Sequence, residues 1–190
     1  PKFLMDGCSV FQKKYPKTVL HLKELPYEQH LDGIRQGKID LTVIAKPKDS
    51  YLNELVYNEL CEDTCAFGVN GESVLARKDK IRRQDLNGTK VLCGTYQYME
   101  ASFEEMLKGS GANLQALHTE YNLESMAQAK FNDSVLVFHS HWKNCYSHIL
   151  KVLPSDIRAG SIGVVMREED RERMKNLITE LRKAMGTQIC

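Results

Sequence analysis

Apolar residues near the start of the chain recur with the spacing of one helical face. They are Phe3, Leu4, Gly7, Cys8 and Phe11. The pattern stops at Tyr15-Pro16, where the proline disfavours helical geometry in the residue before it. We therefore expect an amphipathic helix over residues 2–14, with this stripe packed on a sheet.

The next thirty residues predict a strand, a helix and a second strand. Residues 18–24 place Leu20 and Leu22 on one face and Val19 on the other, as in a strand covered on both faces. Leu31 and Ile34 then follow at helical spacing, and Gly37 suits a left-handed helix cap. The apolar run 39–45 predicts the second strand. A strand, a crossover helix and a strand in this order indicate two parallel strands with a right-handed connection.

The same alternation continues to the end of the chain. Further strands are predicted at residues 55–60, 65–69, 90–93, 114–120, 134–138 and 161–166. Further helices are predicted at residues 100–108, 123–131 and 168–185. On the second of these helices we expect one face to carry Leu123, Met126, Ala127 and Lys130, and on the third we expect a stripe of Met174, Leu177, Ile178, Leu181 and Met185. The pattern predicts an α/β protein with two lobes.

Composition narrows the class of protein. A chain of 190 residues with 42% hydrophobic and 27% charged residues is long enough to bury a core. Its formal net charge of +1 argues against a dedicated nucleic-acid surface. The apolar runs are too short for a membrane span, so we expect no membrane partner. Six cysteines without regular spacing favour reduced thiols and a cytoplasmic location.

Candidate ligand contacts are expected where parallel strands end. In open α/β sheets the binding crevice lies at the carboxyl ends of the strands, close to helix N-termini. The loops that meet this condition supply Ala45, Lys46, Gly94, Thr95, Tyr96, Gln97, Tyr98, His139 and Ser140. Gly94 allows close approach, and the tyrosines offer apolar rings with hydroxyl tips. The alternative is that these tyrosines pack beneath the next helix, with the polar groups only capping it.

Metal and redox sites are weaker alternatives. If residues 141–148 are helical, His141, Cys145 and His148 share a face and could bind zinc, although a fourth ligand is not evident. The alternative places the histidines at the strand end and Cys145 in the core. Cys61 and Cys65 lack the CxxC spacing of a redox pair. We expect no cofactor, and the chain contains no GxSxG, Walker, HExxH or GxGxxG motif of an enzyme.

The order and spacing of several residues resemble one protein family. The matching positions are Phe11, Tyr15-Pro16, Val19 and Leu20, Leu22, Glu24, Leu31, Ile34, Gly37, Ile39, Asp40 and Leu41, followed by Ile81, Asp85, Leu86 and Gly88. This series is similar to the effector-binding domain of LysR-type bacterial transcriptional regulators. The resemblance covers essentially the whole chain and is strongest in the first fifty residues.

The resemblance implies a fold and a function. The fold would be that of type 2 periplasmic binding proteins, with two Rossmann-like lobes and a hinge: residues 1–65 in lobe I, 66–154 in lobe II and 155–190 returning to lobe I. The domain would bind a small effector, anionic or aromatic, and act as a homodimer or tetramer through the helix at residues 2–14. DNA would be bound only by a helix-turn-helix domain that this chain does not contain. An exported solute-binding protein of the same fold is the alternative.

Overall fold

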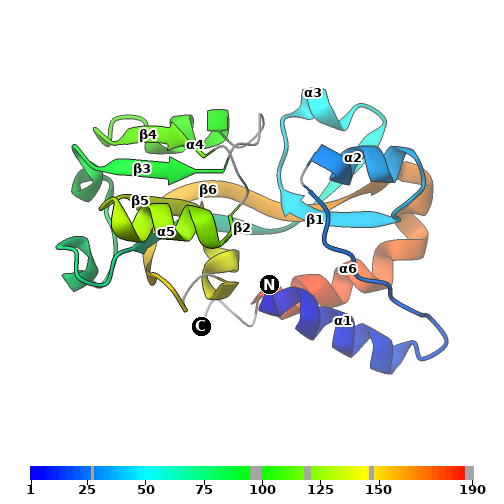
Figure 1. Cartoon of the computed structure of the whole chain (residues 1–190). Coiled ribbons are helices and arrows are strands. Elements are labelled where there is room, and N and C mark those ends of the chain that lie inside the picture. The colour runs from blue at the N-terminus through cyan, green and yellow to red at the C-terminus, as the bar shows by residue number, and fades with distance from the viewer. Residues whose placement is uncertain (27, 95–99, 118–120, 146–147, 187–190) are drawn as a thin grey trace. The chain divides into compact units, whose positions relative to one another are not determined.

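The helices and strands confirm a mixed α/β fold. The computed structural model describes all residues except 27, 95–99, 118–120, 146–147 and 187–190 (Figure 1). The α-helices described are α1 (Lys2–Lys14), α2 (Glu28–Arg35), α3 (Asp49–Leu52), α4 (Glu100–Leu107), α5 (Leu123–Phe131) and α6 (Arg171–Gly186). The strands are β1 (Leu41–Ala45), β2 (Leu55–Val69), β3 (Lys90–Cys93), β4 (Asn113–Ala116), β5 (Val135–His139) and β6 (Lys151–Arg167). Short 3-10 turns are η1 (Leu75–Arg77), η2 (Arg83–Leu86), η3 (Ser140–Cys145) and η4 (Glu168–Asp170).

The chain forms two compact units. Unit 1 combines Pro1–Glu62 with Gly160–Cys190, and unit 2 is Asp63–Ala159. Strands β2 and β6 each contribute residues to both units, so the chain passes between the units inside two continuous strands. None of the helices described is long and apolar enough to span a bilayer.

In unit 1 the stripe predicted for α1 packs against α6 (Figure 1), whereas we expected a sheet as its partner. Phe3, Gly7, Cys8 and Phe11 are the buried residues of α1, and the predicted stripe of α6 is buried throughout. Strand β1 pairs antiparallel with β6, with Leu41 opposite Met166 and Ala45 opposite Ile162. Gly37 has φ of 67° and ends the turn after α2, as predicted.

The prediction of a buried strand at residues 18–24 is wrong. No strand is assigned to this segment, and the Val19 and Leu22 side chains are 72% and 52% exposed. Strand β1 lies at the end of the sheet order, and its recorded pairing is with β6. A segment can form a strand only where a neighbour satisfies its backbone groups. The parallel pair predicted around α2 is therefore wrong as well.

In unit 2, β3 lies between β5 and β4 in the sheet order and pairs parallel with both. Strand β5 in turn pairs antiparallel with β2, with Cys65 opposite His139 and Gly68 opposite Leu136. The core on the two faces includes Phe67, Phe103 and Leu136, all fully buried. Parallel pairing with both faces covered explains why β3 and β5 are almost continuously apolar.

Two strands are longer than predicted. Residues 55–60 and 65–69 belong to the single strand β2, and residues 161–166 are only the last part of β6. In the first half of β6 buried residues alternate with exposed ones, which is the pattern of a strand with one solvated face. Pro154, an exposed residue there, masks that alternation in the sequence.

Helix α5 has the predicted bounds but not the predicted face. Leu123 is 73% exposed, whereas Ser125, Met126 and Ala129 are buried. The N-terminus is fixed by Asn122, whose Oδ1 accepts a hydrogen bond from the Ser125 amide while the Ser125 Oγ accepts one from the Asn122 amide. This reciprocal cap buries the polar Ser125 side chain and sets the rotation of the helix.

Candidate functional site

The densest polar cluster described is centred on the Asp63 carboxylate, in unit 2. His139 Nδ1 lies 3.0 Å from Asp63 Oδ2, and His141 Nδ1 lies 2.8 Å from Asp63 Oδ1. Ser140 Oγ also donates to Oδ1, and the Thr64 amide donates to the same oxygen at 2.8 Å. Four donors therefore converge on one carboxylate whose side chain has no exposed surface.

The strand register explains this convergence. Strands β2 and β5 run antiparallel, with Cys65 opposite His139. Each residue further along β5 then lies opposite a residue earlier in β2, so the chain after His139 extends toward Asp63. Three consecutive side chains, His139, Ser140 and His141, are brought onto one carboxylate in this way.

Hydrogen bonding keeps Asp63 ionised despite its burial. Burial alone would raise the pKa of this carboxyl group. The hydrogen bonds from His139, His141 and Ser140 outweigh that effect and hold the pKa of Asp63 well below its usual range. The neighbouring Cys65 shows the opposite result, since burial, followed by the charge of Asp63, raises the pKa of its thiol to about 12. Cys65 is therefore a neutral thiol beside a buried anion.

Two aromatic rings lie against His139, the last residue of β5. The His139 ring lies 5.7 Å from the Phe103 ring and 6.2 Å from the Trp142 ring, measured between centroids. Trp142 is the single tryptophan of the chain. It therefore lies next to the cluster as a built-in spectroscopic reporter.

Tyr121 connects the end of β3 to the middle of β5. The Gly94 amide donates to Tyr121 Oη at 3.0 Å, and Tyr121 Oη donates to the Val137 carbonyl at 2.5 Å. The Gly94 N–H group thus has a partner within the protein. Thr95, Tyr96, Gln97 and Tyr98, which we expect to contact a ligand, lie outside the described residues.

In unit 1 the candidate contacts are Ala45 and Lys46, where β1 ends. The Lys46 amide donates to the Ser161 carbonyl at 2.9 Å, which holds this loop on β6. The Lys46 ammonium group lies 5.8 Å from the centroid of the Tyr57 ring and 3.9 Å from the Asp49 carboxylate. A hollow of about 470 Å³ is lined by Lys46 and Tyr57, together with Asn58 and Arg171. The loop therefore presents a half-exposed cation beside an aromatic face.

Tyr57 is fixed by a hydrogen bond across the sheet. Its Oη lies 3.0 Å from Ser161 Oγ. The ring passes over Gly163, where a Cβ atom would lie 2.4 Å from Tyr57 Cζ. Burial raises the pKa of Tyr57 to about 12, so its hydroxyl group stays protonated.

The structure brings together some predicted contacts and leaves others separate. His139 and Ser140 share the Asp63 cluster, Gly94 lies at the end of β3, and Ala45 and Lys46 belong to unit 1. The residue that the sequence interpretation missed is Asp63. Its signal was an acidic residue two positions before the apolar run 65–69, where an unpaired carboxylate would be costly to bury.

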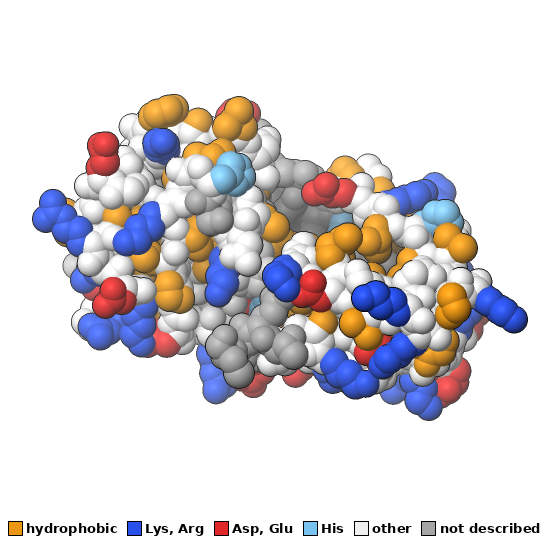
Figure 2. All heavy atoms as spheres, turned by 90° about the horizontal axis from the view of Figure 1, so that it is seen from below, with side chains coloured by type: hydrophobic (Ala, Val, Ile, Leu, Met, Phe, Trp, Pro, Cys, Tyr) orange, Lys and Arg blue, Asp and Glu red, His pale blue; other side chains and the backbone are white. Residues whose placement is uncertain are grey.

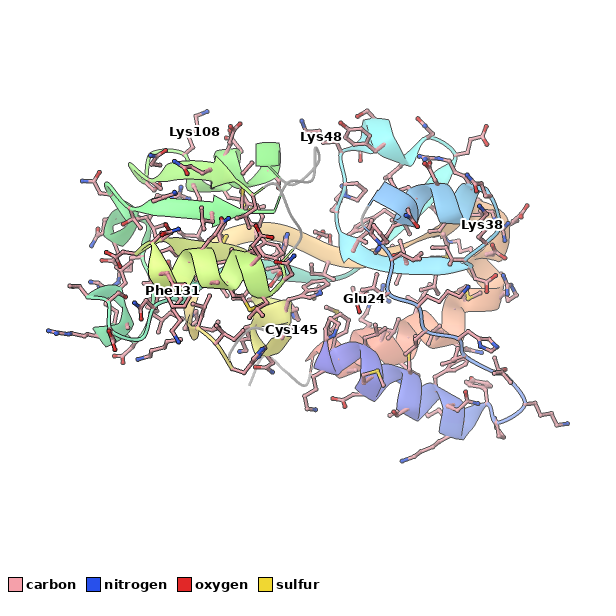
Figure 3. All side chains as sticks on the ribbon, in the orientation of Figure 1. Glu24, Lys38, Lys48, Lys108, Phe131 and Cys145 are labelled. Atoms are coloured by element: carbon pink, nitrogen blue, oxygen red, sulfur yellow. The ribbon has the colours of Figure 1, made fainter. Side chains whose placement is uncertain are left out.

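The proposed zinc ligands are not assembled. His141 faces Asp63, and Cys145, labelled in Figure 3, is exposed, as is His148. Within the described ranges, no group of three or more His, Cys, Asp or Glu side chains is placed to hold a metal ion. The expectation that Cys145 faces the core is wrong, because the 3-10 turn η3 carries it to the surface.

The cluster contains the residue types of a catalytic triad but not its geometry. In a triad the serine hydroxyl donates to an imidazole, which then accepts the proton. Here the single hydroxyl proton of Ser140 is directed at the Asp63 carboxylate. The imidazole Nδ1 atoms are directed at the same carboxylate. The arrangement orients the loop and does not activate the serine.

Comparison with solved structures shows which fold this is. The oxidized form of OxyR matches with a TM-score of 0.76 and 17% identity, over 99% of this chain and 92% of that chain. The reduced OxyR regulatory domain from Pseudomonas aeruginosa matches with a TM-score of 0.71 and 16% identity, over 95% of this chain and 91% of that chain. The regulatory domain of MetR, a LysR family regulator from N. meningitidis, matches with a TM-score of 0.61 and 13% identity, over 96% of this chain and 87% of that chain.

The family match is independent of these structures. The model of the LysR substrate binding domain matches residues 1–186. A comparison with curated protein sequences gave no significant match. Nothing in these comparisons supports the alternative of an exported solute-binding protein. The chain belongs to the LysR substrate-binding domain family, with a fold like that of type 2 periplasmic binding proteins, and is the effector-sensing domain of a LysR-type regulator.

Proposed function

We propose that this domain senses a small anionic or aromatic effector at the loops that end β1, β3 and β5. The proposed contacts are Ala45, Lys46, Gly94, Thr95, Tyr96, Gln97, Tyr98, His139 and Ser140. The observation that carries the proposal is the ordered loop after β5, where three polar side chains are held on one buried carboxylate. A sensor needs such preorganised groups, because a fixed loop loses less entropy on binding.

Lys46 supports the preference for an anionic effector, and the Tyr57 ring beside it supports the preference for an aromatic one. Its ammonium group is half-exposed, and its 3.9 Å separation from Asp49 makes a weak ion pair. An incoming carboxylate can therefore replace Asp49 at little cost. The nearby Tyr57 ring offers a face on which an aromatic ligand can stack.

The output of the domain is proposed to be a population shift. An effector that binds one arrangement of the two lobes more tightly raises the population of that arrangement. The shift would pass to helix-turn-helix domains through a homodimer or tetramer in the cytoplasm. The face of α1 turned away from α6 supports this assembly, since Met5 and Val10 are 56% and 41% exposed there. On the face shown in Figure 2, basic and acidic side chains are interspersed, as suits a domain that does not itself bind DNA.

A thermal-shift panel tests the proposal. The purified domain is melted with acetate, succinate, citrate, benzoate and salicylate, each over a concentration series. A ligand at one hundred times its Kd stabilises the folded state by about 2.7 kcal/mol, which raises the Tm by several degrees. Lys46→Ala and Thr95→Ala should each remove most of this rise. Lys108→Ala, at an exposed lysine of unit 2, is the matched control and should keep it.

Two results would contradict the proposal. One is a ligand whose stabilisation survives both Lys46→Ala and Thr95→Ala. The other is chemical conversion of the bound compound, because a sensor should release its effector unchanged. Proton NMR of the ligand after overnight incubation with the domain checks the second point.

A further inference from the structure

We propose that Asp63 is a positioning residue that fixes the tautomers of His139 and His141 as well as the course of the loop after β5. Both imidazoles carry their Nδ1 proton toward the Asp63 carboxylate. Any proton that these rings exchange with solvent or with a ligand then passes through Nε2. The role in effector binding rests on the proposed function, whereas the tautomers do not depend on it.

The Asp63 carboxylate accepts four hydrogen bonds. Asp63 Oδ1 receives His141 Nδ1, Ser140 Oγ and the Thr64 amide, and Oδ2 receives His139 Nδ1. An ionised carboxylate accepts hydrogen bonds and donates none. Each of the four partners must therefore bring its own proton.

The hydrogen bonds to Asp63 decide which nitrogen of each imidazole ring carries the proton. A neutral imidazole has one N–H group and one bare nitrogen, and its environment decides which nitrogen is which. Because Nδ1 must donate to Asp63, a neutral His139 or His141 has its lone pair at Nε2. The ring is an acceptor there when neutral and becomes a donor only after protonation. The cluster thus fixes what each ring can offer before any ligand arrives.

The groups around Asp63 keep its carboxylate charged. Cys65, on the same strand, remains a neutral thiol, because burial and Asp63 both raise its pKa. The charge of Arg83, in η2, lowers the pKa of that thiol but does not outweigh these two effects. No proton donor beyond the four partners is needed to hold the anion, and burial strengthens each of these hydrogen bonds.

Asp63 lies where the chain passes from unit 1 to unit 2. It is the first residue of unit 2, on the strand that continues from unit 1. The loop His139-Ser140-His141 is therefore fastened to the strand that passes from one unit to the other, at the unit boundary. A change in this loop on effector binding would act directly on that strand.

Histidine NMR tests the proposal without a ligand. Two-bond proton–nitrogen spectra of the ¹⁵N-labelled domain distinguish the two tautomers, and His139→Gln and His141→Gln assign the signals among the six histidines. At pH 8 we expect both rings to be in the Nδ1–H form. In Asp63→Asn the amide offers one acceptor oxygen and one NH₂ donor, so the ring facing the NH₂ group should change to the Nε2–H form.

Trp142 fluorescence provides the second readout. Asp63→Asn should raise acrylamide quenching of Trp142 about twofold or more, because the loop that carries it is less firmly held. Asp156→Asn, at an exposed carboxylate paired with Lys80, is the control and should leave quenching unchanged. A wild-type spectrum with either ring in the Nε2–H form would overturn the proposal even if Asp63→Asn fails to fold. Unchanged tautomers in a folded Asp63→Asn variant would overturn it as well, whatever the outcome of the effector panel.

Discussion

Gly7 of α1 lies against Leu181 of α6 so closely that the two helices leave no room for a side chain between them. A Cβ atom at Gly7 would be 2.9 Å from Leu181 Cδ2 and 3.0 Å from Leu181 Cα. The backbone of α6 is one of these neighbours, and it cannot move aside as a flexible side chain can. Glycine is therefore needed here for close approach of two helices, although it is a poor helix former.

Gly7→Ala should destabilise the domain. The gain in helix propensity of about 1 kcal/mol is offset by overpacking, which costs about 1–3 kcal/mol, and the Leu181 backbone puts this site at the upper end. The free energy of unfolding, measured with urea, should fall by about 1–2 kcal/mol. Gly71→Ala is the control, because a Cβ atom there meets nothing within 4 Å. Equal or higher stability of Gly7→Ala would show that the helices separate easily.

Asp63 should make the stability of unit 2 depend on pH. Its folded pKa is lowered, so the stabilisation is present above the unfolded value of about 3.9 and is lost as the pH falls toward the folded value. Asp63→Ala removes a buried, hydrogen-bonded charge and should cost about 3 kcal/mol at pH 7. Urea unfolding of both proteins at pH 7, 4 and 3 checks this, and the difference between them should shrink at the two acidic values, where the unfolded carboxyl group becomes protonated. A difference that grows as the pH falls would contradict the assignment.

Elements with a strong local pattern could be predicted from the sequence. The stripe of α6 has helical spacing, and every one of its positions is buried. The left-handed turn at Gly37 also depends on local geometry alone. In contrast, residues 18–24 have the alternation of a strand but no strand partner. Their alternation records a local preference, whereas strand formation depends on a neighbour far away in the sequence.

The candidate site was less predictable for the same reason. His139 and Ser140 were identified because they follow a clear strand, but their partner Asp63 is 76 residues earlier than His139. A single sequence does not show which carboxylate meets which imidazole. The prediction of the buried face of α5 was wrong because Ser125 is buried through its reciprocal cap with Asn122. A search for a hydrophobic stripe does not reveal such a cap.

Arg83 should stabilise the end of α4. Its Nη1 donates to the carbonyl oxygens of Met106 and Lys108, at 2.6 and 2.7 Å, where the last turn of the helix leaves carbonyl groups without partners. Arg83→Ala should lower the free energy of unfolding by about 1 kcal/mol, since a cation at a helix C-terminus also interacts well with the dipole. Arg77→Ala, at an exposed arginine of η1, is the control and should change stability by less than about 0.5 kcal/mol. Equal effects of the two substitutions would show that the contacts to α4 are energetically neutral.

The outer face of α1 should mediate self-association. Val10 is half-exposed on the side of α1 that does not pack on α6, where a second copy could cover it. A lysine there places a charge in an apolar contact, so Val10→Lys should weaken the homodimer by about tenfold or more in sedimentation equilibrium. Thr179→Lys, on the exposed face of α6, introduces the same charge in the same unit and should not. A wild-type domain that stays monomeric at high concentration, or a dimer that Thr179→Lys weakens as much as Val10→Lys does, would remove α1 from the interface.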